Sequence, residues 1–392
     1  MTRPVRIVHV IQSVESGGAE QQLLALTRTQ NRDLWQPFVV CTHEIGSLGP
    51  EFEAAGIPLE VIGKRSAYDI GLIRRLAEAI ARHEPAIIQT WLTSANFWGR
   101  LAARLVPGDP ILIAYERTID AWLSPLQHTL DRVLTRGSDM VVGNSSQVSE
   151  FLIRVKRLLP EKVTTIRNGI ALDRAQKCLV WSDKERRVYR ERLGLPTEGF
   201  VVGNIAQPIR EKRLDLLVEV IERLRQRGIL LRVLQLGRDP RPGEEEYFAD
   251  YRRWLGERGV RDLVLRRGFV RDVSPDLAVM DALVQTSDIE GFPNALIEAQ
   301  AMEVPVVATA AGGTPDLVLH RRTGWLVPTG DVEGLVEGLE YIWRHREEAR
   351  KWGTAARLRV ENLFSVETLV RNTTALYAEL LRKHGRAVPT EA

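Results

Sequence analysis

Short β-branched runs alternate with longer amphipathic, helix-like stretches through most of this chain. The expected strands of the first half are residues 7–11, 37–41, 86–89, 111–115, 140–143 and 163–166. The expected helices between them are residues 19–30, 48–55, 95–105, 121–136 and 147–159. Strands that alternate with helices are typical of βαβ units, which build open parallel sheets. The first half therefore predicts one parallel sheet covered by helices.

A second series of the same kind follows a polar segment that begins after Asn168 and Gly169. Its expected strands are residues 200–205, 229–236, 263–266, 282–285 and 304–308. At about 150 residues per domain, a chain of this length holds two such units. We expect an α/β fold with two Rossmann-like domains, residues 1–185 and 186–362, whose parallel sheets face one another across a cleft. Residues 363–392 are expected to form a helix and tail that cross back to the first domain.

The composition excludes several classes of protein. Hydrophobic residues make up 44% of the chain and charged residues 27%, as in ordinary folded proteins. The net charge of +3 is too small to indicate nucleic-acid binding by bulk electrostatics. No apolar run approaches the roughly 18 residues of a membrane span. The chain also enters its first strand without a hydrophobic signal region. We therefore expect a cytoplasmic protein that does not bind nucleic acid.

The two cysteines and one basic, apolar segment bear on the surroundings of the protein. Cys41 and Cys178 are too few for a disulfide framework or a Cys-rich zinc site. Counting leaves a single bridge open, although reduced thiols fit a cytoplasmic protein better. Residues 151–159 mix apolar and basic side chains on an expected helix, which would allow peripheral contact with the inner face of a membrane. The alternative is that this helix buries its apolar face in the first domain.

The segment from Glu290 to Glu298 is the strongest candidate for a ligand-binding site in the sequence. It follows the expected strand 282–285, and ligands of open α/β sheets collect where strands end. Pro293 suits the first position of a helix, whose free N–H groups and positive dipole end favour a bound phosphate. The second glutamate would lie about 7.5 Å further along the helix axis. Two carboxylates at this spacing could hold hydroxyl groups on either side of a diphosphate, although an acidic turn before a solvated helix is the alternative.

Three further loops follow expected strands. Gly17 and Gly18 form a paired-glycine turn into a helix, which allows close backbone approach to an anion but is also a common structural turn. The basic loop 207–213 could neutralise a pyrophosphate, or it could be a solvated surface loop. Residues 311–316 form another glycine-rich turn. We expect all of these loops to open into the cleft between the two domains.

Other catalytic patterns lack support in the sequence. There is no D-x-D motif, and the nearest match is Asp288-Ile289-Glu290. The histidines do not have the spacing of a zinc protease, and no G-x-S-x-G nucleophile turn occurs. His9 lies inside an expected strand and is predicted to be a core residue. Hydrolysis by a serine or a zinc ion is therefore not indicated, and we expect no metal site.

A series of motifs in a fixed order resembles the retaining, nucleotide-sugar-dependent glycosyltransferases of family 4, which have the GT-B fold. The motifs are Gly17-Gly18-Ala19-Glu20, Arg167-Asn168-Gly169-Ile170, Lys212, Gly268-Phe269-Val270, Glu290 to Glu298, Pro305-Val306-Val307-Ala308, Gly312-Gly313 and Gly324-Trp325-Leu326-Val327-Pro328. They extend over nearly the whole chain. The resemblance implies a donor site mostly in the second domain and an acceptor site mostly in the first.

The resemblance also implies roles for individual residues. Glu290, Lys212 and Gly18 would act at the reaction centre. The donor nucleotide sugar would be bound by Gly17, Gln207, Arg210, Gly291, Phe292, Pro293, Asn294 and Glu298, with Glu298 on the ribose hydroxyls. The acceptor would contact Trp91, Ser94 and Arg117, and Trp98 and Trp122 could line the same site unless they pack internally. The co-substrate would be a nucleotide-diphosphate sugar, without any cofactor.

The sequence departs from the usual family pattern at three positions. Gln207 stands where similar proteins often have Arg, Ser94 where they often have His, and Glu303 where Gly is usual; Arg210 could supply the missing cation. We expect transfer of a sugar, with retention of configuration, to a glycan or lipid-linked acceptor in cell-envelope or exopolysaccharide synthesis. The alternative is a non-catalytic GT-B protein that binds a nucleotide sugar or glycan as a partner subunit. A sugar-nucleotide epimerase is a third hypothesis that no histidine or acid cluster supports.

Overall fold

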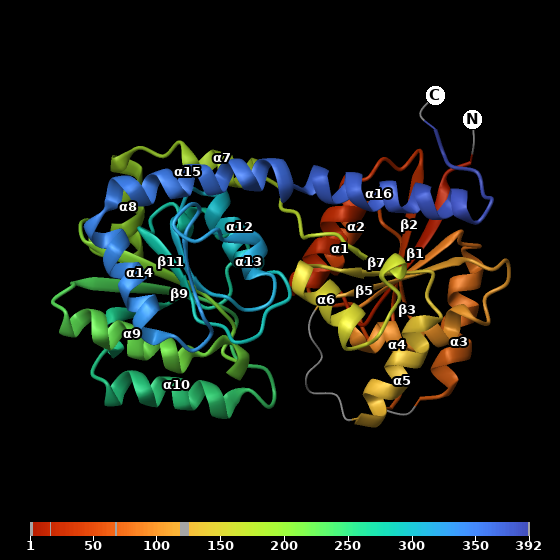
Figure 1. Ribbon diagram of the computed structural model, residues 1–392, viewed down its shortest axis with the longest axis horizontal. Coiled ribbons are helices and arrows are strands. Elements are labelled where there is room, and N and C mark those ends of the chain that lie inside the picture. Colours follow the sequence, from red (N-terminus) through yellow and green to blue (C-terminus); the bar gives the residue numbers. More distant parts are fainter. Residues whose placement is uncertain (1–2, 16, 67–68, 118–124, 391–392) are drawn as a thin grey trace. The chain divides into compact units, whose positions relative to one another are not determined.

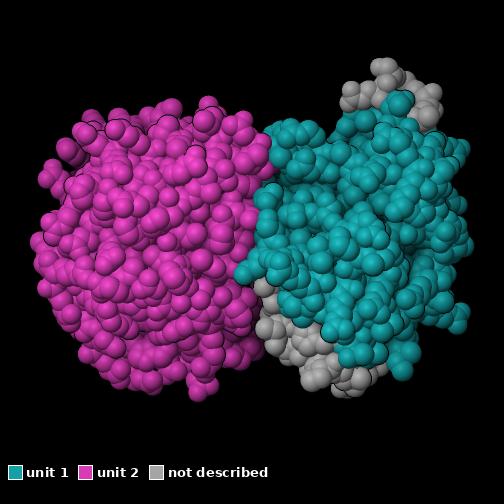
Figure 2. Space-filling view, in the orientation of Figure 1, with its two compact units in different colours: residues 1–169, 366–392 teal, residues 170–365 magenta. Residues whose placement is uncertain are grey.

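The computed structural model describes residues 3–15, 17–66, 69–117 and 125–390, and it divides into two compact units. Unit 1 contains residues 1–169 and 366–392, and unit 2 contains residues 170–365 (Figures 1 and 2). Trp122 lies outside the described residues. Each half of the sequence alternation thus folds as its own α/β unit, and the two-Rossmann architecture is confirmed.

Unit 1 has, over its described residues, a seven-stranded parallel sheet in the order β3-β2-β1-β4-β5-β6-β7. Its strands are β1 (Val5–Ile11), β2 (Trp35–Cys41), β3 (Leu59–Val61), β4 (Ile87–Trp91), β5 (Ile111–Glu116), β6 (Met140–Gly143) and β7 (Val163–Thr165). Its helices are α1 (Gly18–Thr29), α2 (Gly49–Ala54), α3 (Gly71–Arg82), α4 (Thr93–Ala103), α5 (Pro125–Arg136), α6 (Ser146–Arg154) and α16 (Val366–Lys383), with a 3-10 turn at Pro160–Lys162.

The alternation of side chains along β1 explains why helices cover both faces of this sheet. Ile7 and Ile11 pack with α1, α2 and α16 on one face. Val8 and Val10 pack with α3 and α4 on the other face. A strand that is buried on both sides is mostly apolar at odd and even positions alike, as β1 is apart from Arg6 and His9. His9 lies on this strand with no exposed surface, which confirms the prediction that it is a core residue.

Unit 2, which is described throughout, has a six-stranded parallel sheet in the order β10-β9-β8-β11-β12-β13. Its strands are β8 (Phe200–Ile205), β9 (Leu231–Leu236), β10 (Val264–Arg266), β11 (Ala282–Gln285), β12 (Val306–Thr309) and β13 (Trp325–Val327). Its helices are α7 (Asp173–Leu179), α8 (Asp183–Leu193), α9 (Leu214–Gln226), α10 (Glu245–Glu257), α11 (Ser274–Leu277), α12 (Asn294–Ala301), α13 (Thr314–Leu317), α14 (Val332–Arg344) and α15 (Arg346–Leu363), with 3-10 turns at Arg210–Lys212 and Arg261–Leu263.

The boundary between the units differs from the expected one. Residues 170–185, which we expected in the first domain, belong to unit 2. The reason is that Ala175 and Cys178 of α7 pack into the core beneath β8 and α12, although the segment looks polar in sequence. The last helix, α16, belongs to unit 1, where it packs against α1. The expected return of the C-terminal helix to the first domain is therefore seen.

The segment expected to contact a membrane is partly buried instead. Helix α6 ends at Arg154 rather than near Leu159, and Lys156 turns inward. The Lys156 ammonium lies 2.5 Å from an oxygen of Asp131, within a buried ionic cluster that also includes Arg100 and Glu116. Because a buried charge needs partners, this cluster fixes the backbone after α6. Among the described helices, none combines the length and apolar character that a bilayer span requires.

Candidate active site

The carboxyl ends of the unit 2 strands carry the motifs that the sequence singled out. The strand order reverses between β8 and β11, the first and fourth strands of this unit. Ligands of open α/β sheets bind in the crevice at such a reversal. The loops after β8 and β11, which contain Lys212 and Glu290, meet at this point. The topology therefore brings two distant motifs to one place.

Lys212 and Glu290 form an ion pair at the reversal point. The Lys212 ammonium donates to Glu290 Oε1 at 2.7 Å, and the Ser287 hydroxyl donates to the same oxygen at 2.7 Å. Both charged side chains are largely buried, with exposed fractions of 21% and 11%. Neither donor bonds to Glu290 Oε2, so the pair presents one ammonium and one carboxylate oxygen to an incoming ligand.

Side-chain bonds from the β11 loop fix the position of Lys212. The Thr286 hydroxyl donates to the Lys212 carbonyl at 2.8 Å. Arg213, which has a left-handed backbone with φ of 48°, donates to Asp288 at 2.6 Å and also to Asp215. Asp288 is thus held by an arginine, which gives the Asp288-Ile289-Glu290 sequence a structural role. These contacts make the two loops one rigid edge.

The glycine-rich turn after β12 lies against the backbone of Glu290. A Cβ atom at Gly312 would be only 1.8 Å from the Glu290 carbonyl oxygen, and the φ of Gly312 is 53°. The Gly313 amide also donates to the Gly291 carbonyl at 2.8 Å. Only glycine allows so close an approach with a left-handed backbone. The turn at 311–316 therefore supports the Glu290 loop from the β12 side.

Helix α12 starts at Asn294, so Pro293 occupies the N-cap position rather than the first helical position. The Phe292 ring is buried against Phe364, with a centroid separation of 5.5 Å, so this residue can offer only its backbone to a ligand. Glu298 is the fifth residue of the helix, as expected.

Glu298 is a partly buried carboxylate that has no hydrogen-bond or ion-pair partner in the part of the chain that the structure describes. Burial, with a smaller contribution from the charge of Asp272, raises the pKa of Glu298 to about 7. Buried carboxylates are normally hydrogen-bonded, because an unsatisfied one loses solvation without compensation. The free oxygens of Glu298 are therefore suited to accept hydrogen bonds from hydroxyl groups of a ligand.

Gln207 lies beside a cation that the sequence analysis missed. Arg238, which follows β9, donates from Nη2 to Gln207 Oε1 at 3.2 Å and forms a bidentate pair with Glu244. Because arginine can only donate, the amide oxygen of Gln207 must face Arg238, and its NH₂ group faces away. Arg210, which we expected to replace the missing cation, instead has its guanidinium 5.8 Å from the Tyr247 ring centre.

In unit 1, Gly18 is the first residue of α1 and Gly17 its N-cap, directly after β1 and its loop. Gln22 of the same helix exchanges two hydrogen bonds with the backbone of Gly169, at 2.8 and 2.9 Å. Arg117 donates to Asn168 at 2.5 Å. These contacts link helix α1, which begins within the motif at residues 17–20, to the motif at residues 167–170. The bonded residues, Gln22 and Gly169, are 147 positions apart in the sequence.

The aromatic residues expected at the acceptor site are internal. Trp91 has no exposed surface, because β4 is a central strand, and its ring stacks on Tyr115 at 4.6 Å. Trp98 packs in the core between the sheet and α3. Arg117 is also buried, which lowers its pKa to about 10. Ser94, in the first turn of α4, keeps exposed surface. Trp91 and Arg117 are thus buried in this structure, and their contact with an acceptor stays a prediction.

Comparison with family models assigns both halves of the chain. The model described as Glycosyltransferase Family 4 matches residues 16–174, and the one described as Glycosyl transferases group 1 matches residues 198–345. These ranges cover the strand ends described above in each unit. The chain belongs to glycosyltransferase family 4. It is accordingly a glycosyltransferase, as the ordered motifs predicted.

Curated relatives and solved structures agree with this assignment. The chain is 23% identical to the capsular polysaccharide biosynthesis glycosyltransferase CapM of Staphylococcus aureus, covering 80% of this chain and 82% of CapM. It is 26% identical to the sulfoquinovosyl transferase SQD2 of Arabidopsis thaliana, over 82% of this chain and 63% of that protein. HepE from Anabaena, solved with UDP-glucose, has 21% identity and a TM-score of 0.85 over 95% of this chain and 99% of HepE. A glycosyltransferase from Rickettsia africae has 19% identity and a TM-score of 0.84, over 97% and 100% of the two chains. The last two similarities establish the GT-B fold.

Proposed function

We propose that this glycosyltransferase moves a sugar from a nucleotide-diphosphate donor to a hydroxyl group of a glycan or lipid-linked acceptor, with retention of configuration and without a metal ion. The observation that carries the proposal is the pairing of an unpartnered carboxylate, Glu298, with the Lys212–Glu290 pair at the strand-order reversal of unit 2. The Glu298 carboxylate can accept hydrogen bonds from the ribose hydroxyls of such a donor. The Lys212 ammonium, at the same edge of the sheet, can bind its diphosphate.

Each donor group would find a partner of suitable chemistry. The ribose hydroxyls donate to Glu298, and the diphosphate receives the Lys212 ammonium, the Gln207 amide and N–H groups at the start of α12. Hydrogen bonds between charged partners are worth roughly 1.5 to 3 kcal/mol each. Glu290, once Lys212 turns to the phosphates, accepts from hydroxyls of the donor sugar. Lysine and backbone donors would then meet the charge that develops on the leaving diphosphate.

Retention fits a site with these residues. The bond between the sugar C1 and the phosphate oxygen breaks, and the bond between C1 and the acceptor oxygen forms on the same face. The acceptor proton passes to the departing phosphate oxygen, so the protein need not supply a general base. Lys212 stabilises the leaving group, which is the part of this reaction that requires a fixed cation.

The setting of the reaction is proposed from the relatives. CapM is named for capsular polysaccharide biosynthesis, and WcaL of Salmonella typhimurium for colanic acid biosynthesis. A glycan or lipid-linked acceptor in extracellular polysaccharide synthesis is therefore the acceptor class that we propose. Peripheral membrane contact would then involve exposed residues such as Val155 and Leu159, not the buried Lys156.

A panel of nucleotide sugars tests whether the protein is a catalyst or only a binding partner. Free nucleotide should be released from at least one donor by the wild-type protein and far more slowly by Lys212→Gln. Release that is equal in both proteins, or tight donor binding without any release, would contradict the catalytic proposal.

A further inference from the structure

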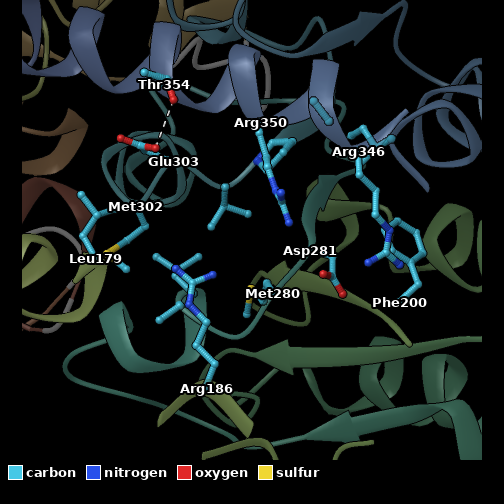
Figure 3. Close-up of a pocket in the computed structure, with 16 residues that line it drawn as sticks. Leu179, Arg186, Phe200, Met280, Asp281, Met302, Glu303, Arg346, Arg350 and Thr354 are labelled. Carbon is cyan, nitrogen blue, oxygen red and sulfur yellow. Dashed lines mark hydrogen bonds between the residues drawn. The ribbon is translucent and has the colours of Figure 1, made fainter. Parts of the chain in front are cut away.

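A pocket in unit 2 lies at the end of the sheet opposite the donor loops. It has a volume of about 370 Å³ and is lined by the start of β8, by the segments before β11 and β12, and by α8 and α15 (Figure 3). Phe200, Met280 and Pro305 lie at the amino ends of their strands, whereas Lys212 and Glu290 follow the carboxyl ends. The two sites are therefore separated by the length of the strands.

Three arginines line this pocket without a partner of their own. Arg186 comes from α8, and Arg346 and Arg350 come from successive turns of α15. Arg186 and Arg350 extend into the pocket from opposite walls (Figure 3). None of the three guanidinium groups forms a hydrogen bond or ion pair within the described chain, and Arg186 Nε is buried without an acceptor. Arg346 and Arg350 are exposed at the mouth of the same cavity. One buried guanidinium nitrogen without an acceptor and two exposed arginines at one cavity favour a bound anion.

The acid on the same wall does not neutralise these arginines. Asp281 accepts from Arg190 at 3.0 Å and from the Val201 amide at 2.7 Å. Arg190 also donates to the Val279 carbonyl. Asp281, which is partly buried, and Arg190 therefore satisfy each other. The three remaining arginines keep their charge available for a ligand.

Glu303 gives the pocket a hydrogen-bond acceptor. It has a left-handed backbone with φ of 56°. A side chain in this conformation costs roughly 1 to 2 kcal/mol. The carboxylate accepts from the Thr354 hydroxyl at 3.1 Å on the pocket wall (Figure 3). The chain thus keeps a carboxylate beside a cationic cavity despite the backbone cost.

We propose that this pocket binds a small phosphorylated molecule that also carries hydroxyl groups, such as a sugar phosphate. Arg186, Arg346 and Arg350 hold the phosphate by charge-assisted bonds. Glu303 accepts from a ligand hydroxyl, and the apolar floor, which includes Met280 and Met302, packs against the carbon skeleton. The volume lies within the range of about 300 to 1,000 Å³ that small-ligand sites usually have. An adjoining hollow of about 440 Å³ shares the three arginines and leaves room for a larger substituent.

Calorimetric titration with glucose 1-phosphate tests the proposal on the 392-residue chain, with the donor site saturated by UDP. The wild type should bind the sugar phosphate saturably. The double variant Arg186→Gln/Arg350→Gln should weaken this binding at least tenfold and leave UDP affinity unchanged. The matched control is Arg192→Gln/Lys351→Gln, which removes two exposed charges from the same helices outside the pocket. The control should bind as the wild type does.

A second variant separates the phosphate from the sugar. Glu303→Gly relieves the left-handed backbone, so it should fold at least as stably as the wild type. It should still bind inorganic phosphate but lose the preference for glucose 1-phosphate over inorganic phosphate. An unchanged preference would overturn the role of Glu303, and this result does not depend on the folding of the arginine variants.

Three outcomes would overturn the proposal. The first is the absence of glucose 1-phosphate binding in the UDP-saturated wild type. The second is equal binding by the pocket variant and the control variant. The third is binding only to vesicles of phosphatidylglycerol in phosphatidylcholine, lost in the pocket variant, because the phosphate would then belong to a lipid headgroup and not to a small soluble molecule.

Discussion

The Lys212 ammonium lies 2.7 Å from Glu290 Oε1, and this contact joins the loops on the two sides of the strand-order reversal in unit 2. Each residue compensates the charge of the other while no ligand is bound. A donor diphosphate would compete for Lys212 and free the carboxylate of Glu290 for the sugar. On the proposed function, the ion pair is a resting arrangement that donor binding would rearrange.

Glu290→Gln should lower turnover about 100-fold, because the amide accepts sugar hydroxyls more weakly and no longer orients Lys212. Nucleotide affinity should change less than threefold, since we place this residue at the sugar and not at the nucleotide. Steady-state release of free nucleotide and titration with UDP measure the two effects. Ser287→Ala is the control: it removes one hydrogen bond to Glu290, worth about 1 kcal/mol, and should lower turnover less than tenfold. A loss of UDP affinity equal to the loss of turnover would argue against this placement.

Glu298 predicts a pH-dependent affinity for nucleotide. Its pKa of about 7 means that the carboxylate is mostly protonated at pH 6 and mostly ionised at pH 8. UDP affinity of the wild type should therefore rise about tenfold from pH 6 to pH 8, beyond the change caused by the phosphate groups of UDP. Glu298→Gln shows the phosphate contribution alone and should be weaker than the wild type at pH 8. Identical pH profiles for the two proteins would place the ribose elsewhere.

The same carboxylate should make the protein less stable at high pH. The folded protein keeps the proton up to about pH 7, whereas an unfolded glutamate loses it near 4.5, so stability falls as pH rises between these values. Glu298→Gln should consequently be more stable than the wild type at pH 8, by about 1 to 3 kcal/mol, and nearly equal to it at pH 4.5. Chemical denaturation at both pH values checks this. A variant less stable at pH 8 would show that the carboxylate has a structural role.

Gln207 should act as a neutral donor to the diphosphate, held in place by Arg238. Gln207→Ala should weaken UDP binding about 10-fold or more, as expected for the loss of a bond to a charged group. Gln207→Arg should raise the affinity for UDP less than threefold. Arg238 already lies 3.2 Å from the amide oxygen of Gln207 and would repel a second guanidinium. Arg210→Gln is the control, since that side chain lies over Tyr247. If Gln207→Arg raised UDP affinity more than tenfold, Arg238 would not be supplying the positive charge that the diphosphate needs near residue 207.

Gly312→Ala should disturb the donor site through the backbone of Glu290. The added Cβ would lie 1.8 Å from the Glu290 carbonyl oxygen, so the loop must shift. Gly330→Ala is a matched control, because Gly330 also has a positive φ, 79°, but no atom within 4 Å of the added Cβ. The control should cost about 1 to 2 kcal/mol of stability and keep its turnover. Gly312→Ala should lower the free energy of unfolding by more than about 3 kcal/mol and should lose most of the turnover. If the two variants were equally destabilised in thermal unfolding, the positive φ alone would explain the loss, and the close contact with the Glu290 carbonyl would not contribute.

Chelation should not affect the reaction, because Lys212 and the start of α12 are proposed to meet the diphosphate. Nucleotide affinity and turnover in excess EDTA should remain within twofold of the untreated protein. Loss of both, with recovery on addition of Mg²⁺ or Mn²⁺, would contradict a metal-independent mechanism.

Local patterns in the sequence were sufficient for the framework and for the α12 motif. The short, nearly continuous apolar runs correspond to central strands such as β1 and β8, and the spacing of Glu290 and Glu298 was evident because both belong to one loop and helix. Each motif in the ordered series is a short continuous stretch of sequence. The series therefore indicated the family without any knowledge of contacts between distant residues.

Long-range contacts could not be predicted in the same way. The ion pair between Lys212 and Glu290 joins residues 78 positions apart, and Arg238 reaches Gln207 from the loop of a neighbouring strand. Trp91 looked suited to a sugar-binding surface, but the position of β4 in the middle of the sheet buries it. The polar appearance of residues 170–185 concealed Ala175 and Cys178, whose packing assigns the segment to unit 2.

The stereochemistry of donor turnover tests the central claim most directly. The donor that the nucleotide-sugar panel identifies would be followed by ¹H NMR at early times, before the free sugar equilibrates between its anomers. A retaining glycosyltransferase predicts that the first product has the anomeric configuration of the donor, and that Glu290→Gln slows its formation. Appearance of the opposite anomer first, or a rate that Glu290→Gln leaves unchanged, would contradict the account.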